Sequence, residues 1–478
     1  MNVFVLILCY FGFIFVSKGF IVKKLGTILT NYDPELTSKS LHEYVDLTVD
    51  PCDNFYKFAC GKWIKDKEIK SKNQTSFYYG DGATNFNNFT KEALDGRYNN
   101  ESTAIKNIYN LRKKCIQLSG EKKENCESEI KYFGIYAFGI LFIKKRRIDS
   151  EKHGDYIIFE DMIKRITEEL RLLIDEKKDI FDKESRDNLL KKLDEIEFTK
   201  KIDRLDISSI LFMETCYKDL GISENDSIEE VLNNIKSLSK MNHTEGSCGY
   251  YIFEYEKYLG HFVSFNALYL DIYNVFTTSF NALVEPWFST YFPNALNYGS
   301  IGFVISHEML HAFDNNFYKY IHGIDHKGEL IVTSESIKNF EKKMKCFVKQ
   351  YGDQKESITT KNINGSLTLS ENIPDNGGIK ISHKAYMKYL QTYMKYLQSI
   401  GGFTSEQLFF ISNGRTFCEH RSKEYLEKQI NDSHTPAEIR TNLLLSNYKP
   451  FSNAFNCKLH SRMNPEHKCE VWKNQNQN

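Results

Sequence analysis

Two histidines and a glutamate in IGFVISHEMLHAFDN, residues 301–315, have the spacing of a metal-dependent hydrolase. In an α-helix the side chains of residues i and i+4 project from the same face, so His307 and His311 can bind one metal ion. Glu308 directly follows the first histidine, which places its carboxylate within reach of a water on the metal. The segment therefore predicts two zinc ligands and a general base on one helix.

A zinc site that catalyses hydrolysis needs a third protein ligand and leaves the fourth position to water. SENIPDNGG, residues 370–378, supplies a candidate in Glu371. Asp375 lies four residues further on, so one helical turn would place both carboxylates on one face. We expect Glu371 to bind zinc and Asp375 to contact a ligand histidine. Pro374 then has to lie in the first turn of this helix.

The surrounding sequence predicts an α+β fold that is mainly helical. Apolar residues flank the two histidines, which indicates a buried helix where the field of an ion is strong. Residues 151–240 carry leucine and isoleucine at helical spacing. Residues 260–270, GHFVSFNALYL, are typical of a strand and precede the histidine helix.

The composition describes a globular protein without excess charge. A chain of 478 residues with 41% hydrophobic content can bury a large core in two or three lobes. Lys+Arg and Asp+Glu both total 63, so the formal net charge is zero. Without a basic excess there is no electrostatic signature of nucleic-acid binding, and we exclude that class.

The N-terminus and the cysteines predict export. The uncharged run Val3 to Val16 is short for a membrane span, which favours a signal peptide cleaved after Gly19 over a retained signal anchor in the plasma membrane. Beyond Cys9, ten cysteines remain, an even number suited to five disulfides, and the lack of any C-x-x-C pair argues against a metal cluster. Seven predicted glycosylation sequons begin at Asn73, Asn88, Asn100, Asn225, Asn242, Asn364 and Asn431.

Six segments together resemble the neprilysin and endothelin-converting-enzyme family of zinc endopeptidases. VISHEMLHAFD is similar to its zinc helix and ENIPDNGG to its third-ligand motif. DPCDNFYKFACGKW, residues 50–63, is similar to its N-terminal cysteine motif, and NAFNCKLHSRMNPEHKCEVW, residues 453–472, to its C-terminal signature. FNALYLDIYN, residues 265–274, is similar to its substrate-binding strand, and DSHTPAEIR, residues 432–440, to a loop with a histidine and an arginine. The segments also follow the family's order.

The resemblance implies a thermolysin-like zincin catalytic lobe with one Zn²⁺ per chain. It makes His307, His311 and Glu371 the zinc ligands. It makes Glu308 the general base, with Asp375 orienting a ligand histidine.

Four further residues acquire roles only through the resemblance. His434 would stabilise the oxyanion of the tetrahedral intermediate, as a positioned imidazole can. Arg440 would hold a carbonyl of the substrate. Asn266 and Ala267 would bind the substrate main chain along a strand edge.

The resemblance also implies disulfide pairings. Three of them tie the N-terminal segment and the C-terminus to the catalytic lobe: Cys52 with Cys457, Cys60 with Cys418, and Cys346 with Cys469. Cys115 is expected to pair with Cys248 across the helical lobe, which leaves Cys126 and Cys216 for each other.

The family pattern predicts how the chain is divided into segments and shows where this sequence differs from typical members. We predict a signal peptide or anchor at 1–19, an N-terminal segment packed on the catalytic lobe at 20–90, a helical lobe at 91–260 and the catalytic lobe at 261–478. The stretch between Cys60 and Asn266 is far shorter than is typical, so the helical lobe is reduced. Tyr78 stands where relatives carry an arginine for the substrate's C-terminal carboxylate, so that preference is not expected here.

We therefore predict a secreted zinc endopeptidase that hydrolyses small extracellular peptides through a zinc-bound water activated by Glu308. The alternative is a catalytically weak or inactive relative that binds peptides. Ser306 and Ala312 replace glycines near the zinc helix, and Leu268 replaces a tyrosine that could contact the substrate. These departures, together with the reduced lobe, keep the alternative open.

Overall fold

The computed structural model describes residues 32–76, 78–198, 209–223, 225–257, 259–321, 329–393 and 399–472. The predicted signal peptide or anchor at 1–19 lies outside these ranges. Among the described residues, no helix has the length and apolar character needed to cross a membrane. The asparagines of all seven sequons are exposed, so a glycan could be attached at each.

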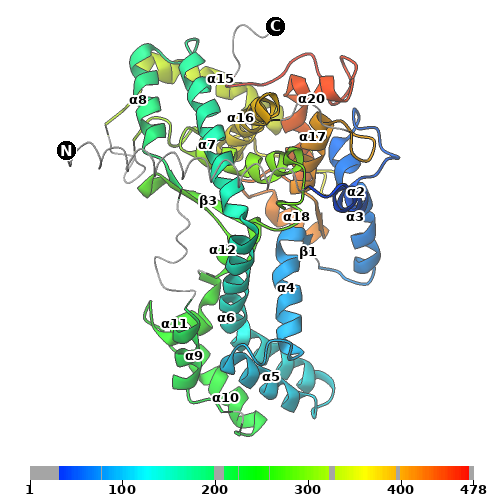
Figure 1. The fold of residues 1–478 in the computed structure, drawn as a ribbon, viewed down its shortest axis with the longest axis vertical. Coiled ribbons are helices and arrows are strands. Elements are labelled where there is room, and N and C mark those ends of the chain that lie inside the picture. The colour runs from blue at the N-terminus through cyan, green and yellow to red at the C-terminus, as the bar shows by residue number, and fades with distance from the viewer. Residues whose placement is uncertain are drawn as a thin grey trace, which may run out of the picture.

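The larger lobe occupies the upper part of Figure 1 and contains both predicted ligand segments. Helix α14, with the two histidines, lies beside α16, which carries Glu371, and further helices surround this pair. The helices of this lobe are α2 (Pro34–Tyr44), α3 (Phe55–Ser71), α7 (Asp155–Glu176), α8 (Lys183–Asp194), α13 (Asn294–Asn297), α14 (Phe303–His311), α15 (Ser334–Gly352), α16 (Leu369–Tyr393), α17 (Ser405–Thr416), α18 (Lys423–Gln429), α19 (Ala437–Ser446) and α20 (Lys449–Ala454).

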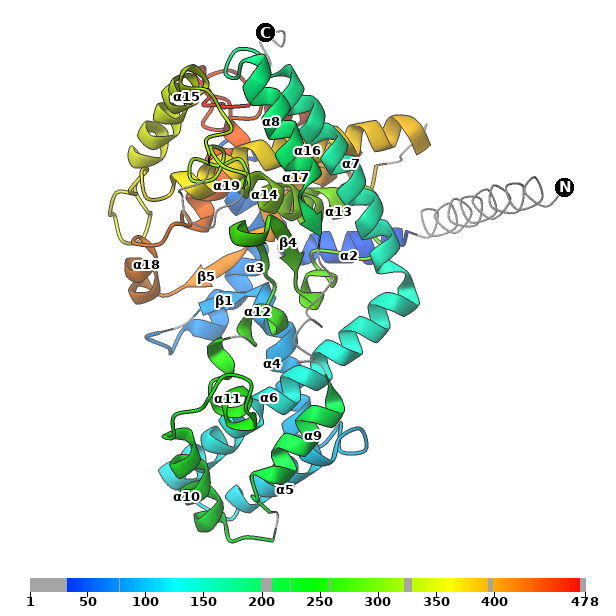
Figure 2. The ribbon, with the colours of Figure 1, turned by 90° about the vertical axis from the view of Figure 1, so that its left-hand side faces the viewer.

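The smaller lobe lies below and is entirely helical in its described part (Figures 1 and 2). Its long helix α6 runs upward and meets α7 of the larger lobe. The chain turns between these helices at Gly154, whose φ of 75° lies in the left-handed region that glycine adopts most readily. The helices here are α4 (Asp81–Leu94), α5 (Thr103–Cys115), α6 (Gly120–His153), α9 (Ile210–Asp219), α10 (Ile228–Ser239), α11 (Cys248–Phe253) and α12 (Gly260–Val263).

The two largest hydrophobic cores among the described residues divide the chain differently from the predicted boundaries. The larger core includes Ile166 and Leu170 of α7 and Leu189 of α8, together with α14 and α16. The smaller core joins α5, α6, α9 and α10. Residues 155–198 therefore pack with the catalytic lobe, although the sequence grouped them in one helical lobe from 91 to 260. The apolar face of α7 is the physical reason, because it is buried against α16.

Two small sheets complete the larger lobe. Strand β1 (Tyr78–Gly80) pairs antiparallel with β5 (Glu419–Arg421) and joins the N-terminal segment to the catalytic lobe. In the second sheet the strand order is β2 (Glu197–Phe198), β4 (Val275–Thr278), β3 (Ala267–Leu270), so β3 is an edge strand of this sheet. The predicted strand at 260–270 is thus only partly correct, because residues 260–263 form the short helix α12.

The close packing of α14 against α16 depends on two glycines of α16. A Cβ atom at Gly378 would lie 3.1 Å from the backbone nitrogen of His307, and one at Gly377 would lie 2.6 Å from Cδ1 of Leu310. Glycine inside a helix costs about 1 kcal/mol relative to alanine, yet here it lets the two backbones approach. Pro374 lies in the second turn of α16, not in the first as predicted, so that turn lacks one backbone hydrogen bond.

Five disulfides connect the described residues. Three join Cys52 to Cys457, Cys60 to Cys418 and Cys346 to Cys469, as the resemblance implied. The pairing of Cys115 with Cys248 is wrong, because Cys115 is bonded to Cys126 and Cys216 to Cys248. Cys115 ends α5 and a short turn leads into α6, which brings the Cα atoms of Cys115 and Cys126 to 5.6 Å.

This connectivity can be checked by mapping disulfides in the unreduced protein. Proteolysis and mass spectrometry should recover one peptide pair joined through Cys115 and Cys126 and another through Cys216 and Cys248, because each pair has bonding geometry within the smaller lobe. Recovery of a Cys115 to Cys248 crosslink as the main species would contradict this arrangement of α5, α6, α9 and α11.

Candidate metal centre

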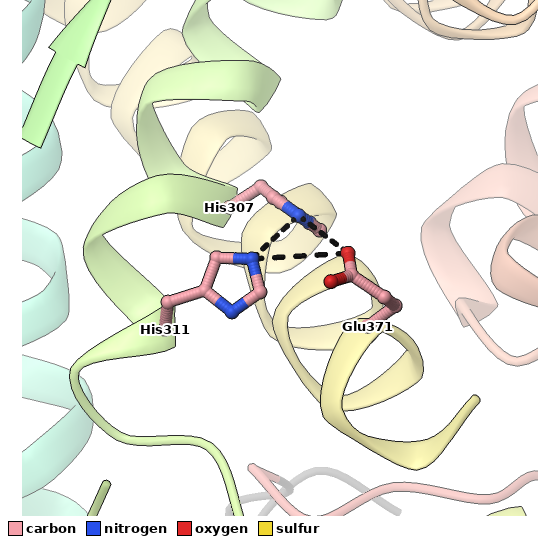
Figure 3. Close-up of side chains that lie close together, drawn as sticks. All are labelled: His307, His311 and Glu371. Carbon is pink, nitrogen blue, oxygen red and sulfur yellow. Dashed lines mark hydrogen bonds and ion pairs between the residues drawn. The ribbon is translucent and has the colours of Figure 1, made fainter. Parts of the chain in front are cut away.

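Three predicted ligand side chains converge between α14 and α16. His307 and His311 extend from α14 toward Glu371 on α16 (Figure 3). The two Nε2 atoms lie 3.0 Å apart, and Oε2 of Glu371 lies 3.2 Å from Nε2 of His307 and 3.8 Å from that of His311. All three potential ligand atoms lie within 4.8 Å of one another. Ligands at about 2.0–2.2 Å from a tetrahedral zinc ion lie roughly 3.3–3.5 Å apart, so these side chains fit one such ion.

The carboxylates beside the imidazoles support the same conclusion. Nδ1 of His307 contacts Oδ1 of Asp375 at 2.9 Å, and Nδ1 of His311 contacts Oδ2 of Asp314 at 3.1 Å. A carboxylate at Nδ1 holds the proton there and leaves a lone pair on Nε2. The two lone pairs then face each other across 3.0 Å, an arrangement that a cation between them would stabilise.

Asp314 is a functional candidate that the sequence analysis missed. Its side chain is 1% exposed, and its second oxygen accepts hydrogen bonds from the backbone nitrogens of Asn316 and Phe317 at 2.7 and 3.1 Å. Asp314 therefore fixes His311 and also the turn that follows α14. The signal was present in HEMLHAFD, where the aspartate follows the second histidine by three residues, but that spacing is common at helix ends.

Asp375 lies between His307 and Arg440. The arginine donates from Nε and one terminal nitrogen to the two oxygens of Asp375, at 2.6 and 2.7 Å, in a bidentate pair. The same guanidinium lies over the ring of Phe417, with 4.8 Å between its carbon and the ring centroid. Arg440, which the resemblance assigned to the substrate, is thus held first by Asp375.

The electrostatics of the site favour a bound cation. Burial would lower the pKa of His307, but contacts with Asp375 and Glu371 raise it to about 10. Burial would raise the pKa of Glu371 and of Asp375, yet the neighbouring imidazoles hold the pKa of Glu371 below its usual range, and Arg440 with His307 does the same for Asp375. Burial raises the pKa of Asp314 in spite of His311. Positive charge at His307 is therefore stabilised by the ionised carboxylates of Glu371 and Asp375.

A cavity of about 410 Å³ opens over the three ligand side chains. Glu308, 7% exposed, lines it together with Asn266 and Ala267 on the side of the edge strand β3. His434 lies at the rim with its side chain 49% exposed. Its Nε2 is 3.2 Å from Oε2 of Glu371 and its Nδ1 is 2.9 Å from Asp432. The structure therefore brings the predicted base, imidazole and substrate strand to one cavity.

A second cavity of about 240 Å³ adjoins the first, since His434 lines both. Arg440, Glu419 and Tyr78 also line it. The guanidinium of Arg421 lies beside the stacked rings of Tyr78 and Tyr425, 4.6 Å from each ring centroid, and is paired with Glu419. An arginine therefore lies beside Tyr78, but it comes from strand β5. The sequence analysis did not anticipate this arginine.

A helix with paired histidines, a carboxylate from a second helix and an adjoining edge strand define a zincin-type metallopeptidase fold. Residues 266–471 match the model of peptidase family M13. These residues thus form an M13 domain, and the predicted resemblance to the neprilysin and endothelin-converting-enzyme family is confirmed.

The similarity to curated relatives extends beyond this domain. The chain is 30% identical to an endothelin-converting enzyme homolog of Locusta migratoria over 387 residues, which cover 78% of this chain and 50% of the relative. It is 32% identical to neprilysin-1 of Caenorhabditis elegans over 353 residues, which cover 70% of this chain and 44% of the relative. The chain thus spans at most half the length of these two proteins.

Solved structures confirm the predicted fold class. The zinc metalloprotease ZMP1 of Mycobacterium tuberculosis, in complex with an inhibitor, matches with a TM-score of 0.51 at 21% identity, covering 75% of this chain and 52% of that one. A Haemonchus galactose-containing glycoprotein complex contains a chain that matches with a TM-score of 0.56 at 17% identity, covering 92% of this chain and 99% of that one. The short form of the fold therefore has a counterpart of similar length.

Replacing Asp314 by asparagine should weaken zinc binding. The amide can still accept from the backbone of the turn but carries no charge opposite Nδ1 of His311, and losses of about tenfold to a hundredfold in metal affinity are typical of such partners. Zinc affinity measured by chelator competition checks this, with Asp353→Asn on the exposed end of α15 as the control. Equal affinity in both variants would contradict a role for Asp314 at the metal.

Proposed function

We propose that this protein is a zinc-dependent endopeptidase that cleaves small extracellular peptides. The observation that carries the proposal is the convergence of His307, His311 and Glu371 in a cavity lined by Glu308 and by an edge strand. A metal site that only stabilises the fold has its fourth position closed by protein, whereas this one opens to a cavity of about 410 Å³. Five disulfides and seven exposed sequons support a secreted protein.

Glu308 is the general base in this proposal. When bound, zinc supplies a Lewis acid that polarises a carbonyl and makes water more acidic. The carboxylate of Glu308 lines the same cavity as the three ligands and follows His307 by one residue, so it is positioned to take a proton from the attacking water. The same carboxylate can then pass that proton to the leaving amine.

His434 is proposed to stabilise the oxygen that becomes negative during attack. The contact of its Nδ1 with Asp432 at 2.9 Å orients the ring. Nε2 lies 3.2 Å from a ligand oxygen of Glu371 and therefore beside the reacting carbonyl. An oriented donor at this position stabilises the transition state more than the ground state.

Arg440 and Asp375 are proposed to hold the site in position. The bidentate pair fixes the carboxylate that in turn fixes His307. Arg440 also lines the second cavity, where its other terminal amino group can donate a hydrogen bond to a substrate carbonyl. The contacts with Asp375 support the first task, and the second is the role that the family resemblance implied.

The substrate main chain is proposed to lie along β3. Strand β3 pairs with β4 on one side, and Asn266 turns its backbone groups toward Ser279, with hydrogen bonds at 2.8 and 3.3 Å. An extended peptide can add to the other edge through main-chain hydrogen bonds, which gives affinity without demanding a particular sequence. Asn266 through its amide and Ala267 through its backbone are the expected contacts.

Substitution Glu308→Gln tests the reaction itself. The amide keeps the shape of the side chain but cannot accept a proton, so cleavage of fluorogenic peptides should fall by at least about a hundredfold, while zinc content stays at one ion per chain. A chelator should abolish cleavage by the wild-type protein, and added zinc should restore it. A wild-type protein that binds zinc but cleaves no peptide would instead favour the inactive peptide-binding relative.

Substitution His434→Ala should lower kcat and leave metal binding intact. The imidazole contacts a ligand oxygen but is half exposed, so its loss removes a donor to the transition state without dismantling the ion's surroundings. The loss of one such donor costs about a hundredfold to a thousandfold in kcat. Steady-state kinetics with zinc analysis decides this: if KM rises while kcat is unchanged, His434 binds the substrate and does not stabilise the oxyanion.

A further inference from the structure

Lys192, near the end of α8, is a buried lysine that the proposed mechanism does not use. Its side chain is 1% exposed, and its ammonium donates hydrogen bonds to the backbone carbonyls of Phe317 and Tyr320 at 2.7 and 2.6 Å. Both acceptors lie in the segment that follows α14. Phe317 itself lines the cavity over the metal ligands. A buried charged group is costly unless it is paired, so this contact holds the segment to α8.

The backbone of the same residue holds the opposite wall of the cavity. The carbonyl oxygen of Lys192 accepts a hydrogen bond from the amide of Asn274 at 3.1 Å. Asn274 is fully buried at the turn between β3 and β4, and its Oδ1 accepts from the hydroxyl of Tyr269 at 2.7 Å. Tyr269 belongs to β3 and lines the cavity. One residue of α8 is thus connected to the substrate strand and to the segment after the metal helix.

A further contact joins the two walls directly beside Lys192. The rings of Tyr269 and Phe317 meet edge to face with centroids 6.3 Å apart, which closes the circle of contacts. Burial lowers the pKa of Lys192 to about 7, opposed by Asp314 on one wall and Asp271 on the other. Either protonation state retains enough N–H groups for both carbonyls. The hydrogen bonds therefore do not require the lysine to be charged.

We propose that Lys192 is a positioning residue that sets the distance between the two walls of the peptide-binding cavity. Without its side chain, the carbonyls of Phe317 and Tyr320 lose their hydrogen bonds from α8, and the segment 315–320 is held less firmly beside β3. The wall at Phe317 would then fit an extended peptide less well. This proposal rests on the proposed function, since it assumes that a peptide occupies the cavity between Tyr269 and Phe317.

The test uses the zinc-loaded full-length protein with Glu308→Gln as the parent, so that a peptide binds without being cut. The probe is an octapeptide chosen from a fluorogenic library by its cleavage with wild-type protein. Lys192→Met removes the donors and keeps the apolar stem, whereas Lys192→Arg restores donors. Lys177→Met is the matched control, because Lys177 is equally buried in the same lobe, 3.8 Å from Asp179, and does not line the cavity.

We expect Lys192→Met to raise the Kd of the peptide about tenfold and to increase hydrogen exchange of the amides at 316–320 by a similar factor. Lys192→Arg should recover most of the affinity, and Lys177→Met should match the parent in both measurements. Tyr269→Phe, which removes only a hydroxyl and carries little risk of misfolding, should raise the Kd about threefold. Faster exchange spread over the whole larger lobe would show a merely structural role and overturn the proposal.

The two proposals fail in different ways. If the wild-type protein cleaves no peptide of the library, the proposed function fails. The positioning role of Lys192 is then tested by hydrogen exchange alone, and it fails if Lys192→Met leaves the exchange rate of the amides at 316–320 unchanged. If peptides are cleaved and bound but Lys192→Met and Tyr269→Phe bind them as tightly as the parent does, only the positioning role of Lys192 fails.

Discussion

The backbones of α14 and α16 approach closely at Gly377 and Gly378, and the rest of the site depends on that contact. A side chain at Gly378 would press on the backbone of His307. With the helices separated further, Glu371 would no longer lie 3.2 Å from His307, and Asp375 would lose its contact with the other imidazole nitrogen. Two carboxylates one helical turn apart on α16 therefore meet the two nitrogens of one imidazole from α14. Helix packing, not loop conformation, sets this geometry.

Charge is the second constraint, because the packing buries several ionisable groups together. Glu371, Asp375 and Asp314 are at most 8% exposed, and Arg440 contacts Asp375 directly. Removing carboxylates from water is costly unless positive charge accompanies them. A divalent ion between His307 and His311 would provide that charge, so metal binding and the stability of this lobe are expected to be coupled. The N-terminal segment supports the same lobe through the disulfide of Cys60 with Cys418 and the pairing of β1 with β5.

The sequence alone was sufficient to predict those parts of the site whose residues are spaced by one helical turn. His307 and His311 at i and i+4, and Glu371 and Asp375 at the same spacing, give two faces whose chemistry is apparent before any fold is known. The role of Asp314 was missed, because an aspartate after a helix is ordinarily a surface residue. The contacts of Lys192 with both walls of the cavity could not be predicted, since its partners lie more than 80 residues away and are mostly backbone atoms. Backbone acceptors leave no trace in side-chain patterns.

The same limit explains the errors in lobe boundaries and disulfides. Residues 155–198 have the composition of the smaller lobe, and only the burial of α7 against α16 places them in the larger one. The pairing of Cys115 with Cys126 depends on how tightly α5 turns into α6, which a family pattern taken from longer relatives did not convey. Both errors concern how helices pack, and both leave the ligand set intact.

The geometry of α14 and α16 implies that they hold one zinc ion through two imidazoles and a carboxylate. Zinc K-edge X-ray absorption on the purified full-length protein tests it most directly. We predict one zinc per chain with nitrogen and oxygen ligands at about 2.0–2.1 Å, two imidazole ligands, and no sulfur, and a loss of the bound zinc in His307→Ala. A spectrum with sulfur at about 2.3 Å, or zinc that remains bound in His307→Ala, would contradict the claim.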